Sequence, residues 1–389
     1  MFRRCRSIRA DLNRRLLGER DRARLLLQAK CVHARANGDD GRRASEKGGR
    51  ESRGPEFRLH KSKGQHILTN PRVLDSIVRR ADPKPGDTVL EIGPGTGNLT
   101  LKLLEASRKV VAVEIDGRMV DVLRKRVADC GFEDQLTVIQ KDALKTQFPP
   151  FDIVVANIPY QISSPLVIKL VYGKIRFRSA TLLLQKEFAR RLLANPGDSE
   201  YNRLAVNVKL VADVEFAMDV SKRDFLPVPK VDSSVVIIHP KTELPNVNLA
   251  EWWAFTRTCF GKKNKTLGAT FKQKRKVMEI LKTSTLVGLR EDVTINDNDG
   301  ISGVSIDGGD MDEEGNSEEE SLSSSVPEGE MNLFKEKIVG VLRAEGFEDK
   351  RPSKLSNDEL LHLLAVLNHA GAYFRNQVKS RQDTLLADV

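Results

Sequence analysis

The stretch "NIPYQISSP", which begins at Asn157, follows the apolar run "FDIVVA" and combines an amide, a proline and a tyrosine in four residues. The side-chain oxygen of Asn157 and the backbone carbonyl of Ile158 could each accept one N–H of an amino group on adenine. Pro159 would fix the backbone so that this carbonyl points into a site, and Tyr160 could stack on the base. Because such bonds direct the amine lone pair at an electrophilic carbon, positioning and electrostatics would supply most of the rate.

A glycine-rich stretch, "EIGPGTGN", follows the first predicted strand and precedes the helical pattern "LTLKLLEA". Its glycines, Gly93, Gly95 and Gly97, would let the backbone turn tightly and approach a ligand whose polar groups meet the amino end of the helix. The spacing is G-x-G-x-G, whereas dinucleotide-binding sites use G-x-G-x-x-G. The stretch alone predicts a nucleotide-like ligand without identifying it.

Polar residues also stand at the ends of the next predicted strands. Glu114 in "VAVEID" could accept hydrogen bonds from both hydroxyls of a ribose, and Asp142 in "IQKDAL" could accept one from the amino group of adenine. Asn157 follows the fourth strand. Each alone is typical of an exposed turn, but the carboxyl ends of parallel strands line one crevice. An adenosine-shaped ligand is therefore expected, either a dinucleotide or S-adenosylmethionine. The sequence offers no second half-site for a nicotinamide, which favours S-adenosylmethionine.

These residues need a sheet to position them. Strand-like and helix-like segments alternate over residues 57–240, which predicts a doubly wound α/β fold. The first five strand candidates are apolar on both faces, as in buried parallel strands. Amphipathic helices are predicted at 71–81, with Asn70 as N-cap, and at 117–129. The strand candidates are 87–92, 109–115, 136–140, 151–156, 179–185, 214–220 and 233–239.

From about residue 245 the pattern is helical only, and an acidic segment interrupts it. Residues 291–320 contain twelve Asp or Glu and no Lys or Arg, a composition that cannot bury enough apolar surface to order itself. The expected organisation is an extension (1–56), an α/β domain (57–244), a helical domain in two parts (245–285 and 332–374), a disordered acidic insert (286–331) and a tail (375–389).

Composition excludes several classes of protein. Cysteines 5, 31, 130 and 259 form no CxxC pair and the six histidines are dispersed, so neither a disulfide framework nor a metal site is expected. The absence of any apolar run near 18 residues argues against a membrane span. The net charge is +10, and the chain outside 291–320 carries +22. That excess indicates a polyanionic partner such as nucleic acid, or simply a basic soluble protein.

The first 56 residues are Arg-rich, with leucines at helical spacing in "RADLNRRLLGERDRARLLLQAK". This pattern is typical of a mitochondrial transit peptide, although Asp11, Glu19 and Asp21 are unusual in one. The alternative is a basic tail that contacts RNA or directs import into the nucleus or nucleolus.

Several motifs occur in one order: "HKSKGQHILTN", "LEIGPGTGNLT", "VEID", "NIPYQISSP", "QKEFARRL", "FLPVPKVDSSV" and "KNKTLG". In this set the chain resembles the rRNA adenine N6,N6-dimethyltransferase family over about residues 57–285 and 332–374. The resemblance implies a Rossmann-like class I methyltransferase sheet with a smaller all-α domain. It also implies dimethylation of two adjacent adenosines in the 3′-terminal hairpin of small-subunit rRNA, with S-adenosylmethionine as cofactor, by a monomer acting on a pre-ribosomal particle.

The resemblance also implies roles for individual residues. His66 and Leu68 of "GQHIL" would close over the cofactor, with Gly93, Glu114, Asp142 and Asn157 beneath it. Phe225 would stack on the adenine face opposite Tyr160, whereas its spacing alone fits a core aromatic beside a proline-rich turn. Phosphate contacts are expected from basic residues that could equally be solvated helix surface. These are Lys61, Lys63, Lys262, Lys263 and Lys265.

Two other functions are compatible with parts of the sequence. A ribosome-assembly or mitochondrial transcription factor could keep the fold after losing catalysis, but the retained Glu114, Asp142 and "NIPY" argue against it. A nicotinamide oxidoreductase is disfavoured by the glycine spacing.

Overall fold

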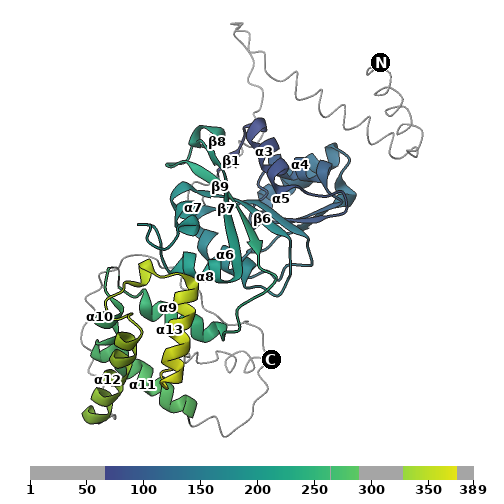
Figure 1. The fold of residues 1–389 in the computed structure, drawn as a ribbon. Coiled ribbons are helices and arrows are strands. Elements are labelled where there is room, and N and C mark those ends of the chain that lie inside the picture. The colour runs from purple at the N-terminus through teal and green to yellow at the C-terminus, as the bar shows by residue number, and fades with distance from the viewer. Residues whose placement is uncertain (1–65, 263, 289–326, 375–389) are drawn as a thin grey trace, which may run out of the picture. The chain divides into compact units, whose positions relative to one another are not determined.

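The computed structural model describes residues 66–262, 264–288 and 327–374 (Figure 1). Of these, 66–159 and 222–230 form one compact unit, and 160–221 with the residues from 231 onward form a second. Among the described helices, none combines the length and apolar composition that a membrane span requires.

Three predicted segments lie wholly or mainly outside the described residues: the extension 1–56, the tail 375–389 and the acidic insert, of which 289–326 are not described. The two ends of the predicted insert are helical. Residues 286–288 complete one helix and 328–331 begin another.

Four parallel strands in the order β4-β3-β2-β5 form the sheet of the first unit. All five residues of β2 are buried, as expected of an apolar strand between parallel neighbours. Only β4 differs from the predicted burial: its residues are half-buried because it lies at the edge of the sheet. The strands are β2 (Thr88–Ile92), β3 (Lys109–Val113), β4 (Leu136–Ile139) and β5 (Ile153–Asn157).

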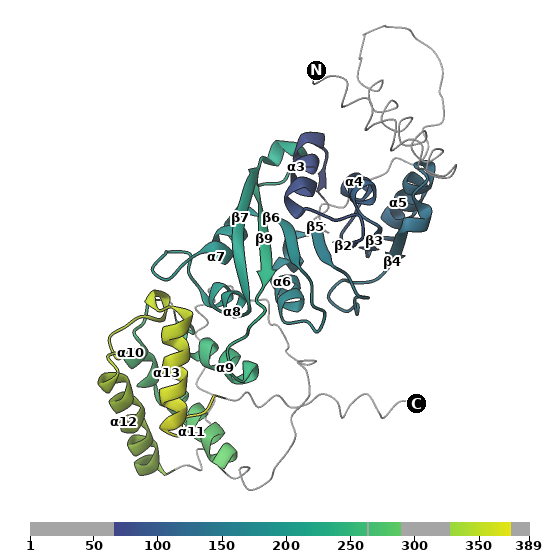
Figure 2. The same cartoon turned by 45° about the vertical axis from the view of Figure 1, so that its right-hand side comes forward.

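Among the described residues of this unit the α-helices are α3 (Pro71–Ala81), α4 (Asn98–Ala106) and α5 (Gly117–Asp129), and in Figure 2 α5 lies beside β3 and β4. The first begins as predicted, since the Asn70 side chain accepts from the backbone N–H of Arg72 and Pro71 occupies the first turn. A short antiparallel ribbon completes the unit. It pairs β1 (Ile67–Leu68) with β8 (Phe225–Leu226), which are far apart in the chain.

The second unit contains three antiparallel strands in the order β6-β9-β7. The strand order of the whole mixed sheet is β4-β3-β2-β5-β6-β9-β7. A bulge between Phe216 and Met218 interrupts the register of β7 with β9. The strands are β6 (Ser179–Gln185), β7 (Ala212–Val220) and β9 (Ser233–Pro240).

The remaining elements are helical. The α-helices are α6 (Ser163–Val171), α7 (Lys186–Leu193), α8 (Arg203–Val211), α9 (Leu249–Cys259), α10 (Leu267–Phe271), α11 (Lys274–Gly288), α12 (Glu328–Ala344) and α13 (Asn357–His369). Short 3-10 turns are η2 (Glu133–Gln135), η3 (Tyr160–Ile162), η4 (Lys222–Asp224) and η5 (Pro352–Lys354).

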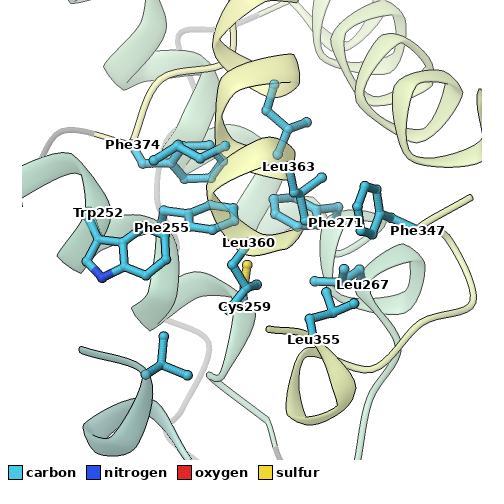
Figure 3. Close-up of a cluster of buried hydrophobic side chains, with 14 of the residues drawn as sticks. Trp252, Phe255, Cys259, Leu267, Phe271, Phe347, Leu355, Leu360, Leu363 and Phe374 are labelled. Carbon is cyan, nitrogen blue, oxygen red and sulfur yellow. The ribbon is translucent and has the colours of Figure 1, made fainter. Parts of the chain in front are cut away.

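Helices from both sides of the gap at 289–326 build one hydrophobic core. Figure 3 shows the rings of Phe255 and Phe271, which precede the gap, grouped with Phe374, which follows it. The Phe374 ring centroid lies 5.2 Å from that of Phe255 and 6.1 Å from that of Phe271, both in edge-to-face geometry. The two predicted helical segments therefore fold together.

Backbone contacts hold these segments in register. The N–H of Phe374 donates to Oε1 of the buried Glu251 (3.2 Å), and the N–H of Gly268 donates to the Glu348 carbonyl (2.8 Å). A Cβ on residue 268 would come within 2.8 Å of that carbonyl oxygen, so only glycine permits this approach of α10 to the segment after α12.

Candidate active site

The glycine loop joins β2 to α4 in a conformation that other residues rarely adopt. Gly93, Gly95 and Gly97 have φ values of 69°, 55° and 86°. At Gly93 a Cβ would lie 3.5 Å from both the Asn157 carbonyl oxygen and Cδ of Pro159. The loop and the start of the "NIPY" stretch are therefore within van der Waals range of each other.

Glu114 connects the second strand to the same loop. Its Oε2 accepts from the N–H of Gly95 (3.3 Å) and its Oε1 from the N–H of Asp116 (2.9 Å). Burial raises the pKa of this carboxyl, while its backbone hydrogen bonds oppose that shift. A buried carboxylate fixed by two backbone donors still has lone pairs for further donors.

Asp142, three residues after β4, is half-buried and caps its own turn. Its Oδ1 accepts from the N–H of Leu144 (2.9 Å), and its backbone carbonyl accepts from Thr146. This is the turn-capping arrangement that the residue alone would suggest. A carboxylate can accept further hydrogen bonds, so the capping role is compatible with ligand contact.

The amide of Asn157 has a defined orientation. Its Nδ2 donates to the backbone carbonyl of His66 (3.1 Å). A carbonyl oxygen can only accept, so the NH2 side of the amide must face His66, and Oδ1 must point away from it. This orientation leaves the Asn157 Oδ1 available as an acceptor on the side of the amide away from His66. Ile158 is buried, and Pro159 packs on the glycine loop.

The segment containing His66 and Leu68 is held from three directions. Besides the bond to Asn157, the His66 ring donates through Nδ1 to the Pro227 carbonyl (2.8 Å), since that oxygen can only accept. The Leu68 carbonyl accepts from Nδ2 of Asn98, the first residue of α4 (2.8 Å). His66 therefore uses its backbone toward Asn157 and its imidazole toward the loop after β8.

Phe225 is placed in β8 opposite Leu68 and is only 3% exposed. A ring that stacks on a base needs an accessible face. The observed burial matches the alternative, a core aromatic beside a proline-rich turn.

Tyr160 begins η3 in the second unit and is half-buried. Its hydroxyl shares a hydrogen bond with Oγ of Ser233 (2.9 Å), and burial raises the pKa of the phenol. Ser233 belongs to the "FLPVPKVDSSV" motif, so this bond joins two of the motifs in the resemblance. The sequence did not identify Ser233 separately, although its place in that motif is a usable signal.

Comparison with known proteins decides the family. The family model described as ribosomal RNA adenine dimethylase matches residues 56–301, more than half of the chain. The chain belongs to this family. It is therefore a methyltransferase, as the sequence motifs predicted.

Two plant relatives and one solved structure support the assignment. This adenine dimethylase is 62% identical to the "Ribosomal RNA small subunit methyltransferase, mitochondrial" of Arabidopsis thaliana over 84% of this chain and 83% of the relative. It is 48% identical to another Arabidopsis protein, "Ribosomal RNA small subunit methyltransferase", over 81% of this chain and 92% of that one.

The crystal structure of a dimethyladenosine transferase from Plasmodium falciparum is 38% identical, with a TM-score of 0.65 over 79% of this chain and 99% of that one. The predicted class I methyltransferase fold with a helical carboxyl-terminal region is confirmed.

Two residues close in sequence to Glu114 and to the glycine loop were not singled out from the sequence. Ile115, directly after Glu114, is 62% exposed, which is unusual for a large aliphatic side chain beside a buried carboxylate. Glu91 lies within β2, is 1% exposed, and its Oε2 lacks a hydrogen-bond partner among the described residues. The sequence could have pointed to Glu91, because it is an acidic residue inside a strand that is otherwise apolar on both faces.

The basic residues predicted to contact RNA are only partly described. Lys262 and Lys265 are exposed on the loop between α9 and α10, on either side of Asn264, whose φ is 67°. Lys61, Lys63 and Lys263 lie outside the described residues. Among the His, Cys, Asp and Glu side chains that the structure describes, no group is arranged to hold a metal ion.

Proposed function

We propose that this methyltransferase transfers methyl groups from S-adenosylmethionine to N6 of two adjacent adenosines in the 3′-terminal hairpin of small-subunit rRNA, making N6,N6-dimethyladenosine. The observation that carries the proposal is the orientation of the Asn157 amide: the His66 carbonyl holds its Nδ2, which leaves Oδ1 as an acceptor, and the Asn157 backbone lies beside the glycine loop. Family membership and the names of the relatives support rRNA as the substrate.

The residues around the glycine loop fit S-adenosylmethionine. Glu114 is a buried carboxylate with acceptor capacity left for ribose hydroxyls, and Asp142 has the same capacity for an adenine amine. The exposed Ile115 side chain offers an apolar surface to the flat adenine ring. His66 and Leu68 are assigned to the closing segment. When bound, S-adenosylmethionine supplies a methyl group activated by its sulfonium.

Asn157 and Ile158 position the target amine. The amide Oδ1 and the Ile158 carbonyl accept the two N–H groups of adenine N6, which draws the nitrogen lone pair out of conjugation with the ring. After the first transfer one N–H remains, so the second transfer depends on a single acceptor bond.

Tyr160 supplies the stacking face, with its hydroxyl anchored on Ser233. Phe225 could stack only if the β1–β8 ribbon opened, because its ring is buried.

A Glu114→Gln substitution tests the cofactor assignment. The change keeps the size of the side chain but removes the charge that strengthens bonds from the ribose hydroxyls. A hydrogen bond to a charged group contributes about 1.5–3 kcal/mol, so the Kd for S-adenosylmethionine should rise about tenfold to a hundredfold. Isothermal titration calorimetry measures it. Glu105→Gln, on the exposed surface of α4, is the control and should bind normally. An affinity of Glu114→Gln within twofold of wild type would contradict the assignment.

The reaction is tested with the purified full-length chain, methyl-labelled S-adenosylmethionine and small-subunit precursor particles from each compartment. We expect label in the rRNA and primer-extension stops at two neighbouring adenosines of the 3′ hairpin. Label confined to protein, or stops elsewhere in the rRNA, would reject the proposed substrate.

Mitochondria are the proposed location, where the enzyme would act as a monomer on the organellar pre-ribosomal particle. The 62% identical relative is named mitochondrial, whereas the name of the 48% identical one carries no location. The Arg-rich residues 1–56 fit the same compartment. A reporter fused to 1–56 should enter mitochondria; a nucleolar signal alone would favour cytosolic ribosomes.

The exposed Lys262 and Lys265 are proposed to contact rRNA phosphates, together with Lys61, Lys63 and Lys263. Such contacts carry little sequence information and weaken steeply with salt. The choice of adenosines would then depend on the shape of the folded rRNA and on the base pocket.

A further inference from the structure

The loop between η4 and β9 presents apolar side chains to solvent in an unusual way. Leu226 is 62% exposed and Val228 is 56% exposed, although they stand only two residues apart. Their neighbours Phe225 and Pro229 are buried, so Leu226 and Val228 face outward between two residues that face inward. We call Leu226 and Val228 the apolar pair.

The loop that carries the apolar pair is held firmly in place. The Asp224 carbonyl accepts from the N–H of Thr69 (2.9 Å), and Oδ1 of Asp224 accepts from Nδ2 of Asn70 (2.6 Å). Leu226 pairs with Ile67 in the β1–β8 ribbon. Because these bonds fix the backbone on both sides of Phe225, the outward direction of Leu226 is part of the fold and not the result of a loose loop.

The same loop is connected to the catalytic amide through one residue. The His66 ring donates to the Pro227 carbonyl, between the two members of the apolar pair, while the His66 backbone carbonyl accepts from Asn157. The backbone between the two members of the pair is therefore connected to Asn157 by two hydrogen bonds through a single residue.

Charge indicates what covers the pair. Lys222, Arg223 and Lys230 are exposed on the same nine-residue segment, while its acid, Asp224, is bonded to Asn70. Cations interleaved with exposed apolar side chains are typical of surfaces that contact unpaired RNA, where bases pack on the apolar groups and phosphates on the cations. A single-stranded RNA segment offers both kinds of group at once, bases for the apolar side chains and phosphates for the cations.

We propose that Leu226 and Val228 pack against the base next to the target adenosine, and that Lys222, Arg223 and Lys230 hold the adjoining phosphates. This inference rests on the proposed function and extends it. A base held on this pair stays unstacked, so one adenosine of the adjacent pair is kept apart while the other is methylated. The pair is then a determinant of the choice of site.

The test uses full-length enzyme and an rRNA hairpin with 2-aminopurine at the position beside the target adenosine. This base becomes more fluorescent when it leaves its stack. Wild type should raise the fluorescence on binding, and Leu226→Ser/Val228→Ser should reduce that rise and weaken RNA binding about tenfold. Leu244→Ser, another exposed leucine outside this loop, is the control and should behave as wild type.

A second arm replaces the neighbouring base with an abasic site. Wild-type affinity should then fall to that of the double variant, while the double variant should lose nothing more, because the contact is already absent. The inference would be overturned if the abasic site lowered the RNA affinity of both enzymes equally, or if the double variant raised the fluorescence as much as wild type. Either outcome would hold whether or not the variant also failed to bind a protein partner. The fluorescence and the RNA affinity are measured without methyl transfer. They therefore still test the contact with the neighbouring base if the methylation assay rejects the proposed function.

Discussion

Asn157→Ala is expected to lower the rate of adenosine methylation about 10²- to 10³-fold, the usual effect of removing one preorganised polar group that acts in the transition state. The alanine removes the Oδ1 acceptor and also the bond to the His66 carbonyl. Single-turnover rates at saturating S-adenosylmethionine and rRNA measure the effect on chemistry separately from binding.

A matched control separates catalysis from support of the closing segment. Asn98 donates to the Leu68 carbonyl, just as Asn157 donates to the His66 carbonyl. Unlike Asn157, Asn98 has no proposed contact with the amine of the target adenosine. Asn98→Ala should weaken cofactor binding and leave the saturated rate within about tenfold of wild type. If Asn157→Ala retained a rate similar to that of Asn98→Ala, the catalytic assignment would be wrong.

Glu91 should give the protein a strong dependence of stability on pH. Burial, with a smaller contribution from the nearby Glu114 charge, raises its pKa from 4.5 to about 8. Between these two values the folded state binds a proton that the unfolded state releases. The contribution of this proton to the free energy of unfolding is therefore full below pH 4.5 and is lost as the pH rises through 8. The free energy of unfolding falls over this range by about 1 kcal/mol per pH unit.

A Glu91→Gln substitution should remove this dependence. Glutamine is neutral and of the same size as protonated Glu91, so the variant should match wild type near pH 4. Near pH 8.5 it should exceed wild type in free energy of unfolding by roughly 4 kcal/mol. Urea unfolding at a series of pH values measures both, with Glu105→Gln as the control that keeps the wild-type slope. Parallel curves for wild type and Glu91→Gln would show that another group binds the proton.

Much of the fold could be predicted from local patterns because the relevant forces are local. Apolar runs and their periodicity predicted the four strands of the first unit and the helices at 71–81 and 117–129, since hydrophobic spacing directly reflects which faces are buried. The positive φ values of Gly93, Gly95 and Gly97 were likewise implied by residue type. The half-buried character of β4 was missed because strand order, and not composition, places it at an edge.

The sequence by itself determined the family and the methyltransferase class and proposed the members of the candidate site, because those inferences depend on residue types at specific spacings. Only the tertiary structure decided how these side chains are oriented and buried. It set the direction of the Asn157 amide through a carbonyl 91 residues away, and it buried Phe225 opposite Leu68. It also isolated the Glu91 carboxyl and turned Leu226 outward. Hydrogen-bond direction and burial depend on groups that are distant in the chain, and for that reason no local pattern records them.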